Sequence, residues 1–265
     1  MQLDAGCEIS FEASVETPLI LMLRPRSGSG QWVLREEYLL EPRVPVVEYT
    51  DGYGNLCQRL VAPQGSFWIR TTARVETADT IDVEPEAAFV PIQELPDDVL
   101  QFLLPSRYCQ SDRLGDLASK ITADHSPGYA QVEAIRRWIQ STIEYRYGTS
   151  DTTTSAIETA ATKTGVCRDF AHLGIALCRN LSIPARMVVG YLYQLDPMDL
   201  HAWFEAFVGN RWYTFDATQA KPRGNRIAIA YGRDATDVAL STQFGPMELI
   251  EMKVWVKEAE EEGGG

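Results

Sequence analysis

The dipeptide Gly209-Asn210 constrains the fold more than any other feature, because it separates two runs of alternating residues. Gly-Asn between two such runs is typical of a two-residue β-hairpin turn. A turn of that length fixes the pairing register, so Val208 must face Arg211 and each earlier residue must face the next later one. The sequence therefore predicts an antiparallel hairpin in which His201 faces Thr218.

The two faces of this hairpin differ in chemistry. Alternate side chains of a strand point to opposite faces, and one face is uniformly apolar, which predicts that it belongs to the core. We interpret the second face as the one that is not core. It carries His201, Trp203, Glu205 and Phe207 from the first strand and Trp212, Thr214, Asp216 and Thr218 from the second.

His201 and Asp216 are diagonal neighbours on that second face. Diagonal pairs are about 7–8 Å apart between Cα atoms, a gap that an imidazole and a carboxylate can close. Glu205 is the rival acid, but it lies four positions along the same strand, about 13 Å from His201 at about 3.3 Å per residue. The register therefore selects Asp216, rather than Glu205, as the acid that would orient the imidazole.

A helix that begins after Gly165 carries the candidate nucleophile. Cys167 lies at its start, where free backbone N–H groups and the positive end of the helix dipole favour a thiolate and can hold a developing oxyanion. Cys178 lies in the middle of the helix, and we interpret it as a small core residue. A stripe of small side chains beside an apolar stripe predicts that this helix approaches a sheet closely. The small stripe is Cys167, Ala171, Gly174 and Cys178, and the apolar stripe is Phe170, Leu173, Leu177 and Leu181.

The other two histidines are poor partners for Cys167. His172 follows it by five positions, about 140° around the helix, and we expect a surface or capping role for it. His125 precedes Ser126-Pro127, and we expect it to be exposed in a loop. His201 remains, but it lies 34 positions after Cys167 (201 − 167), and nothing local brings the two residues together.

The chain changes character near its middle. The first ninety or so residues predict β-structure, because runs rich in β-branched and aromatic residues alternate with turn signals. From Ser126 onward, helical spacing and then strand patterns predict an α+β unit. The expected strands are 9–15, 19–23, 31–40, 44–49, 56–62 and 67–75 in the first half, and 185–193, 201–208 and 211–218 in the second.

We therefore assign the chain to the α+β class. An antiparallel β-sandwich or barrel-like domain at 1–95 precedes a Pro-containing linker at 96–125 and a catalytic core at 126–255. Residues 256–265 are acidic and end in glycine, and we interpret them as a solvated tail without a function.

Composition excludes several classes of partner. The net charge of −13 (24 − 37) repels phosphate backbones and anionic lipid, so we expect neither nucleic acid nor membrane as a partner. The five cysteines are widely spaced and no Cys-x-x-Cys occurs, so a disulfide scaffold and a structural zinc site are both disfavoured. The chain opens without a basic cluster or a long apolar stretch, which predicts no signal peptide and a cytoplasmic location.

Four blocks of this sequence resemble, in order and spacing, the core of the bacterial transglutaminase-like superfamily, whose members are often described as candidate cysteine proteases. The resemblance extends to Asp51-Gly-Tyr-Gly-Asn55 in the first half and to a closing segment at 231–238. The blocks are Thr-Gly-Val-Cys-Arg-Asp-Phe-Ala-His-Leu at 164–173, Ile-Pro-Ala-Arg-Met-Val-Val-Gly-Tyr at 183–191, His-Ala-Trp-Phe-Glu at 201–205 and Phe-Asp-Ala-Thr at 215–218.

The resemblance implies a papain-like core in which Cys167 is the nucleophile, His201 is the base and then the acid, and Asp216 orients the imidazole. It implies thioester chemistry without a metal or organic cofactor. The backbone N–H of Cys167 is the expected oxyanion donor, and residues 145–149 are the candidate source of a second donor.

We expect hydrolysis of an amide bond in a peptide or protein substrate. A protein-glutamine transglutaminase, with Trp203 and Trp212 as candidate walls of an amine channel, is the alternative within the same chemistry. A non-catalytic binding module is the alternative outside it. The sequence indicates neither the substrate nor the oligomeric state.

Overall fold

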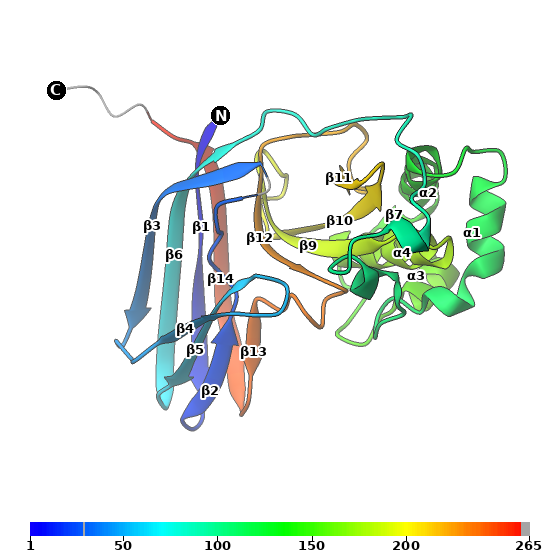
Figure 1. Cartoon of the computed structure of the whole chain (residues 1–265). Helices are drawn as coiled ribbons and strands as arrows, with labels where there is room; N and C mark the ends of the chain where they lie inside the picture. The colour runs from blue at the N-terminus through cyan, green and yellow to red at the C-terminus, as the bar shows by residue number, and fades with distance from the viewer. Residues whose placement is uncertain (29, 261–265) are drawn as a thin grey trace.

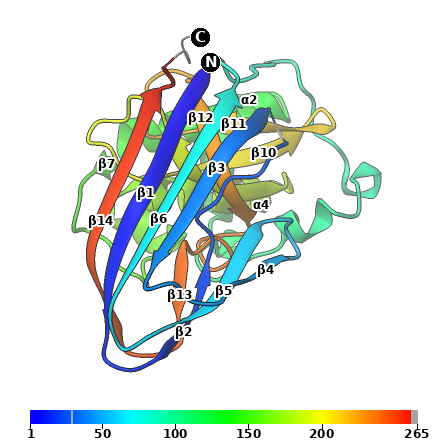
Figure 2. The same ribbon diagram turned by 90° about the vertical axis from the view of Figure 1, so that its left-hand side faces the viewer.

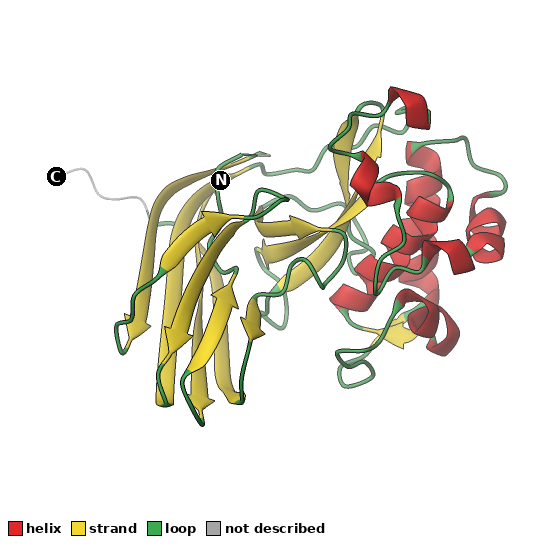
Figure 3. Cartoon of the chain, turned by 60° about the horizontal axis from the view of Figure 1, so that its bottom comes forward, coloured by secondary structure: helices red, strands yellow, loops and turns green. Residues whose placement is uncertain are grey.

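The computed structural model describes residues 1–28 and 30–260, and it places a β-rich part beside a helix-covered part (Figure 1). The helices gather at one end of the molecule and the long strands at the other (Figure 3). The predicted α+β class is confirmed by antiparallel sheets in both parts. Among the residues described, no helix is long and apolar enough to cross a membrane.

Two four-stranded antiparallel sheets pack face to face in the β-rich part. Alternation explains their pairing, because Phe67, Ile69 and Val75 of one strand are buried while Trp68 and Arg70 are partly exposed. The first sheet (Figure 2) has the order β14 (Met247–Glu258), β1 (Gln2–Ala13), β6 (Gly65–Thr77) and β3 (Gln31–Glu41). The second has the order β13 (Ser241–Gln243), β2 (Thr17–Leu21), β5 (Leu56–Ala62) and β4 (Val47–Thr50).

The last strands of the chain return to these sheets. β14 pairs antiparallel with β1 along nearly its whole length, and β13 pairs with β2. The sequence analysis had placed residues up to 255 with the catalytic core. The difference arises because β14 is mostly exposed and its apolar alternation is interrupted at Ile250, where the register with β1 shifts, so it was not marked as a sandwich strand. Of the predicted acidic tail, 261–265 lie outside the described residues.

The second part is a sheet with helices on one face. The sheet has the order β11 (Arg211–Phe215), β10 (His201–Val208), β9 (Ala185–Leu192) and β12 (Arg226–Gly232). The central helix α4 (Cys167–Asn180) packs between β9 and β10 on one side and the other helices on the other side. Those helices are α1 (Gly115–Thr122), α2 (Tyr129–Thr142) and α3 (Ala156–Thr162). A Cβ at Gly174 would lie 2.5 Å from the Phe204 ring, so the predicted close approach of helix and sheet is confirmed.

The hairpin register is confirmed over the paired residues, which run from Val208 opposite Arg211 to Phe204 opposite Phe215. Gly209 and Asn210 both have positive φ, at 56° and 63°, as a turn of this type requires. The face that was interpreted as not core is nevertheless buried, and this correction has a simple cause. The segment that follows β6 has no regular periodicity, yet three of its apolar side chains, Val90, Leu95 and Val99, cover that face.

Two side-chain amides dock the β-rich part onto β12. Gln31 accepts from the backbone N–H of Ala228 (2.7 Å) and donates to its carbonyl (2.8 Å), as a neighbouring strand would. Asn55 does the same to Tyr231, at 2.8 and 2.7 Å. The sequence analysis singled out the motif that ends at Asn55 for its family resemblance, whereas here it also joins the two parts of the molecule.

Candidate active site

Cys167 is the first residue of α4, and the start of this helix is fixed by its own side chains. The Asp169 carboxylate accepts the backbone N–H of Val166 (2.9 Å), which satisfies one N–H that the helix leaves unpaired. Arg168 forms an ion pair with the same carboxylate (3.2 Å). Cys167 is partly exposed, whereas the other four cysteines are buried, so it is the thiol that a solvent-borne reagent can reach.

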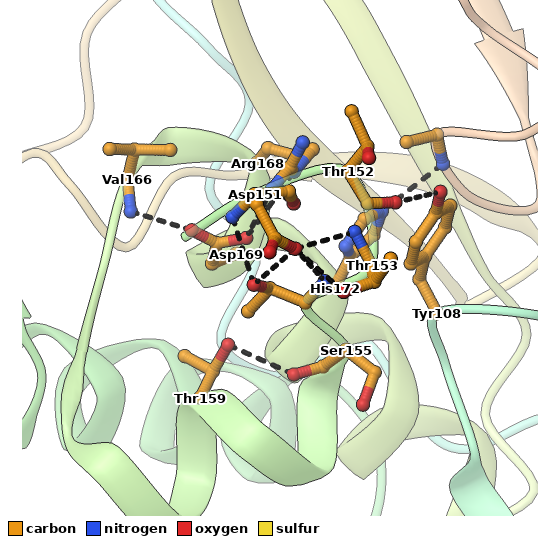
Figure 4. A network of polar contacts seen from close by, with 12 residues as sticks. Tyr108, Asp151, Thr152, Thr153, Ser155, Thr159, Val166, Arg168, Asp169 and His172 are labelled. Carbon is orange, nitrogen blue, oxygen red and sulfur yellow. Dashed lines mark hydrogen bonds and ion pairs between the residues drawn. The ribbon is translucent and has the colours of Figure 1, made fainter. Parts of the chain in front are cut away.

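A polar loop is tied to this end of the helix (Figure 4). Arg168 donates to the carbonyl of Asp151 (2.6 Å), and the Asp151 carboxylate accepts both the backbone N–H and the hydroxyl of Thr153 (2.7 Å each). The Tyr108 hydroxyl donates to the carbonyl of Thr152 (2.7 Å). These contacts hold the loop against the first turn of α4 and position that turn.

The structure brings His201 and Asp216 into direct contact. His201 Nε2 donates to Asp216 Oδ2 at 2.7 Å, and the two side chains are 2% and 3% exposed. The other carboxylate oxygen accepts the backbone N–H (3.0 Å) and the hydroxyl (2.7 Å) of Thr218. Arg226 Nη2 donates to Oδ2 at 2.8 Å. The carboxylate is therefore held from four directions, and Nδ1 is the ring nitrogen of His201 that remains for Cys167.

The charges of His201, Asp216 and Arg226 shift the pKa values of the site. Burial disfavours the charged form of His201, but the charge of Asp216, its hydrogen bond and Cys167 together raise the pKa of His201 to about 9. Burial also disfavours the Asp216 carboxylate, yet Arg226 and His201 hold the pKa of Asp216 well below its usual range. An imidazolium and a carboxylate therefore coexist at neutral pH.

Tyr145 lies beside the thiol. Its strand β7 (Glu144–Tyr145) pairs in parallel with β8 (Thr164–Gly165), which leads directly into α4. Burial, followed by the charge of Cys167, raises the pKa of Tyr145, while a hydrogen bond from the Cys167 backbone N–H acts in the opposite direction. The Tyr145 hydroxyl therefore lies within hydrogen-bonding reach of the Cys167 backbone N–H.

A cavity of about 200 Å³ opens beside His201. Its walls combine aromatic, apolar and acidic side chains. The cavity is lined by Tyr145, Tyr147, Leu195, Asp196, Pro197, Asp199, Leu200, His201, Thr218 and Gln219.

The remaining sequence predictions have mixed outcomes. Glu205 is paired with Arg186 (2.6 Å) rather than with His201, and His125 is exposed as expected. The surface role expected for His172 is wrong, because this side chain is fully buried and its ring stacks on Tyr108 with centroids 4.9 Å apart. The cause is that α4 is covered on all sides, so a wheel position away from the sheet is not a solvent position.

Arg226 was missed by the sequence analysis. It lies on β12, 10 positions after Asp216, and neither a motif nor a turn marks it. An arginine at the first position of a strand is ordinarily read as a solvated end, so no signal in one sequence could have assigned it to the acid.

Comparisons with known proteins identify the family. The sequence profile of the transglutaminase-like superfamily matches residues 115–217, which include Cys167, His201 and Asp216. A protein of Mycobacterium leprae is 30% identical over 237 residues, which are 82% of each chain. The chain belongs to the transglutaminase-like superfamily. Within this superfamily, the crystal structure of a "putative cysteine protease" from Cytophaga hutchinsonii is 38% identical, covers 100% of this chain and 92% of its own, and superposes with a TM-score of 0.91.

A more distant relative of this transglutaminase-like protein occurs in Mycobacterium tuberculosis. It is 28% identical over 180 residues, which are 61% of this chain and 49% of the relative. The structural similarity to the Cytophaga protein covers both parts of the molecule. The superfamily profile covers the helices, the hairpin and the site.

Proposed function

We propose that this protein is a cysteine hydrolase that cleaves an amide bond of a peptide or protein through a thioester on Cys167. The observation that carries the proposal is the position of His201, which is hydrogen-bonded to Asp216 through Nε2 and interacts with the Cys167 thiol at the start of α4. A nucleophile, a base and an orienting acid in this order are the parts that acyl transfer requires.

The proposed reaction has two steps. The Cys167 sulfur attacks the carbonyl carbon, the carbon–nitrogen bond breaks, and the His201 imidazolium gives its proton to the leaving amine. Water then attacks the thioester while the neutral His201 takes one of its protons, and the carbon–sulfur bond breaks to release the acid and restore the Cys167 thiolate and the His201 imidazolium. The backbone N–H of Cys167 and the Tyr145 hydroxyl would donate to the oxyanion in both steps.

Hydrolysis is favoured over transfer to an amine by the placement of two aromatic residues. Trp203 and Trp212 were the candidate walls of an amine channel, but both line a different cavity, on the side of the sheet away from α4. The cavity beside His201 has walls of other residues. The reaction requires Cys167 to stay a thiol, which suits the reducing cytoplasm expected from the sequence.

The first test is the pH dependence of alkylation, because exposure alone would make Cys167 the preferred target. An ordinary thiol with a pKa of about 8.5 reacts roughly 75-fold faster at pH 8 than at pH 6, since its thiolate fraction rises by that factor. Between pH 6 and pH 8 we expect the rate at which iodoacetamide alkylates Cys167 of the folded protein to change by less than threefold. In urea-unfolded protein the alkylation rate of the same thiol should show the ordinary rise. His201→Ala should restore the ordinary rise in the folded protein. An ordinary rise in the unmodified folded protein would favour the non-catalytic module.

The second test separates the two reactions. The protein is incubated with a mixture of peptides and a fluorescent primary amine, with Cys167→Ala as the control. New peptide termini that the control does not produce support hydrolysis. Incorporation of the amine at glutamine without new termini would support a transglutaminase instead.

A further inference from the structure

A second and larger cavity, of about 440 Å³, lies on the face of the β11-β10-β9-β12 sheet that is turned away from α4. The start of β3 and the segment that follows β6 close it from the side of the sandwich; Figure 1 shows that segment passing above this sheet. Its volume is within the usual range for small-molecule sites, roughly 300–1,000 Å³. Its polar and aromatic walls include Arg186, Trp203, Glu205, Trp212, Arg226 and Tyr231.

Two buried donors in the wall have no partner within the part of the chain that the structure describes. They are Nη1 of Arg226 and Nε1 of Trp203. The Arg226 side chain is 7% exposed and Trp203 is 3% exposed. Buried donors are almost always hydrogen-bonded, and leaving one unpaired is costly. The rest of the Arg226 guanidinium is paired, because Nε donates to the carbonyl of Arg223 (2.9 Å) and Nη2 donates to Asp216.

The two donors lie close together. The guanidinium carbon of Arg226 is 5.0 Å from the centre of the Trp203 ring. A single carboxylate, with two oxygens in one plane, can accept from both a guanidinium N–H and a neighbouring indole N–H.

The charges in the wall favour an anion. Arg186 is paired with Glu205 (2.6 Å), and its guanidinium stacks over the rings of Trp212 and Tyr231 at 4.2 and 4.3 Å. Arg211 is paired with Asp82. Arg226 is different, because the one carboxylate that it contacts, Asp216, is shared with His201. Arg226 is therefore the arginine of this wall whose carboxylate partner also serves another group, and a carboxylate from a ligand would pair with its remaining donor.

We propose that this cavity is a binding site for a small aromatic monocarboxylate, whose carboxylate accepts hydrogen bonds from Arg226 Nη1 and Trp203 Nε1. The aromatic body would pack between the indole and phenol rings of the wall and the apolar side chains of Ala78 and Ile81, which line the same cavity. This site is separate from the cavity beside His201 and does not depend on the proposed reaction.

Benzoate is the probe, and its neutral amide, benzamide, is the matched control. In isothermal titration calorimetry of the full chain at pH 7, we expect benzoate to bind with a Kd of about 1 mM or tighter. Benzamide should bind at least tenfold more weakly. Trp203→Phe keeps the ring but removes the N–H, and it should weaken benzoate binding about fivefold, which is the usual effect of one lost hydrogen bond. Trp255→Phe, in the wall of another cavity, should leave the affinity unchanged.

A further experiment tests which of the two cavities benzoate occupies. Alkylation of Cys167 with iodoacetamide modifies the candidate nucleophile and should leave benzoate binding unchanged. The proposal is overturned if benzoate does not bind up to about 20 mM, if benzamide binds as tightly, or if alkylation abolishes binding. It is also overturned if Trp203→Phe, shown by urea unfolding to be folded, binds benzoate as the unmodified protein does. Arg226→Lys, which retains the charge but loses the fork of donors, provides a second variant with the same expected weakening.

Discussion

Replacing Asp216 with asparagine should change how the stability of this protein depends on pH. The carboxylate accepts from His201, from Arg226 and twice from Thr218. An asparagine amide cannot accept at both ends, so an NH₂ group would face a donor on one side. The variant also removes the negative charge that keeps His201 protonated.

The size of the effect follows from the pKa of His201, which is about 9 in the folded protein and about 6.5 when unfolded. A raised histidine pKa contributes stability that is fully present below the unfolded value and is lost as the pH rises through the folded value. At 1.36 kcal/mol per unit, the full contribution is about 3 kcal/mol, of which about 2 kcal/mol is lost between pH 6.5 and pH 8.5. The variant lacks this contribution.

The assay is urea unfolding followed by tryptophan fluorescence, at half-unit steps from pH 6.5 to pH 8.5. The free-energy difference between the unmodified protein and Asp216→Asn should shrink by about 2 kcal/mol across this window. Titrations common to both proteins cancel in the difference. Glu205→Gln is the matched control, since its carboxylate pairs with the half-buried Arg186 and not with a histidine, and its free-energy difference should stay constant. Parallel curves for Asp216→Asn would refute the assignment of a protonated His201 held by Asp216.

Three further predictions concern packing and docking. Gly174→Ala should destabilise the protein by about 1–3 kcal/mol, because the new methyl would lie 2.5 Å from the Phe204 ring; an unchanged urea midpoint would contradict this. Asn55→Ala should cost about 1–3 kcal/mol in the same measurement, since it removes both hydrogen bonds to the backbone of Tyr231, and Asn55→Asp should recover only part of the loss. Arg179→Met should lower Tm by roughly 6–12 °C, for a loss of about 3 kcal/mol. The reason is that Arg179, which is 4% exposed, donates five hydrogen bonds to three other segments. An unchanged Tm in calorimetry would disprove that role.

The contact between His201 and Asp216 could be predicted because it depends on local rules. A two-residue turn at Gly209 leaves one register, and the alternation of a strand then places the two side chains on the same face. The position of Cys167 at a helix start is similarly local, since Gly165 and the apolar spacing mark where the helix begins. How that helix approaches the hairpin depends on the whole fold, and the family resemblance, rather than any local rule, indicated it.

The features that the sequence did not reveal are set by long-range packing. His172 is buried because loops far away in the chain cover the outer side of α4, and no pattern within the helix carries that information. Arg226 reaches Asp216 across the end of the sheet, so its role depends on where β12 joins. Gln31 and Asn55 look like turn or strand-end residues until β12 is placed beside them.

The pairing of β14 with β1 has a consequence for the order in which the molecule can assemble during translation. Domains generally fold as units, beginning with the part that leaves the ribosome first. Here the sandwich contains the first strand of the chain and also the described strand nearest its end, so it stays incomplete until residues 247–258 have been made. Until then the 12 residues of β1 keep one edge of unpaired backbone N–H and C=O groups, the kind of edge that recruits other strands. The sheet and helices around Cys167 can therefore finish folding before the domain that precedes them in the sequence.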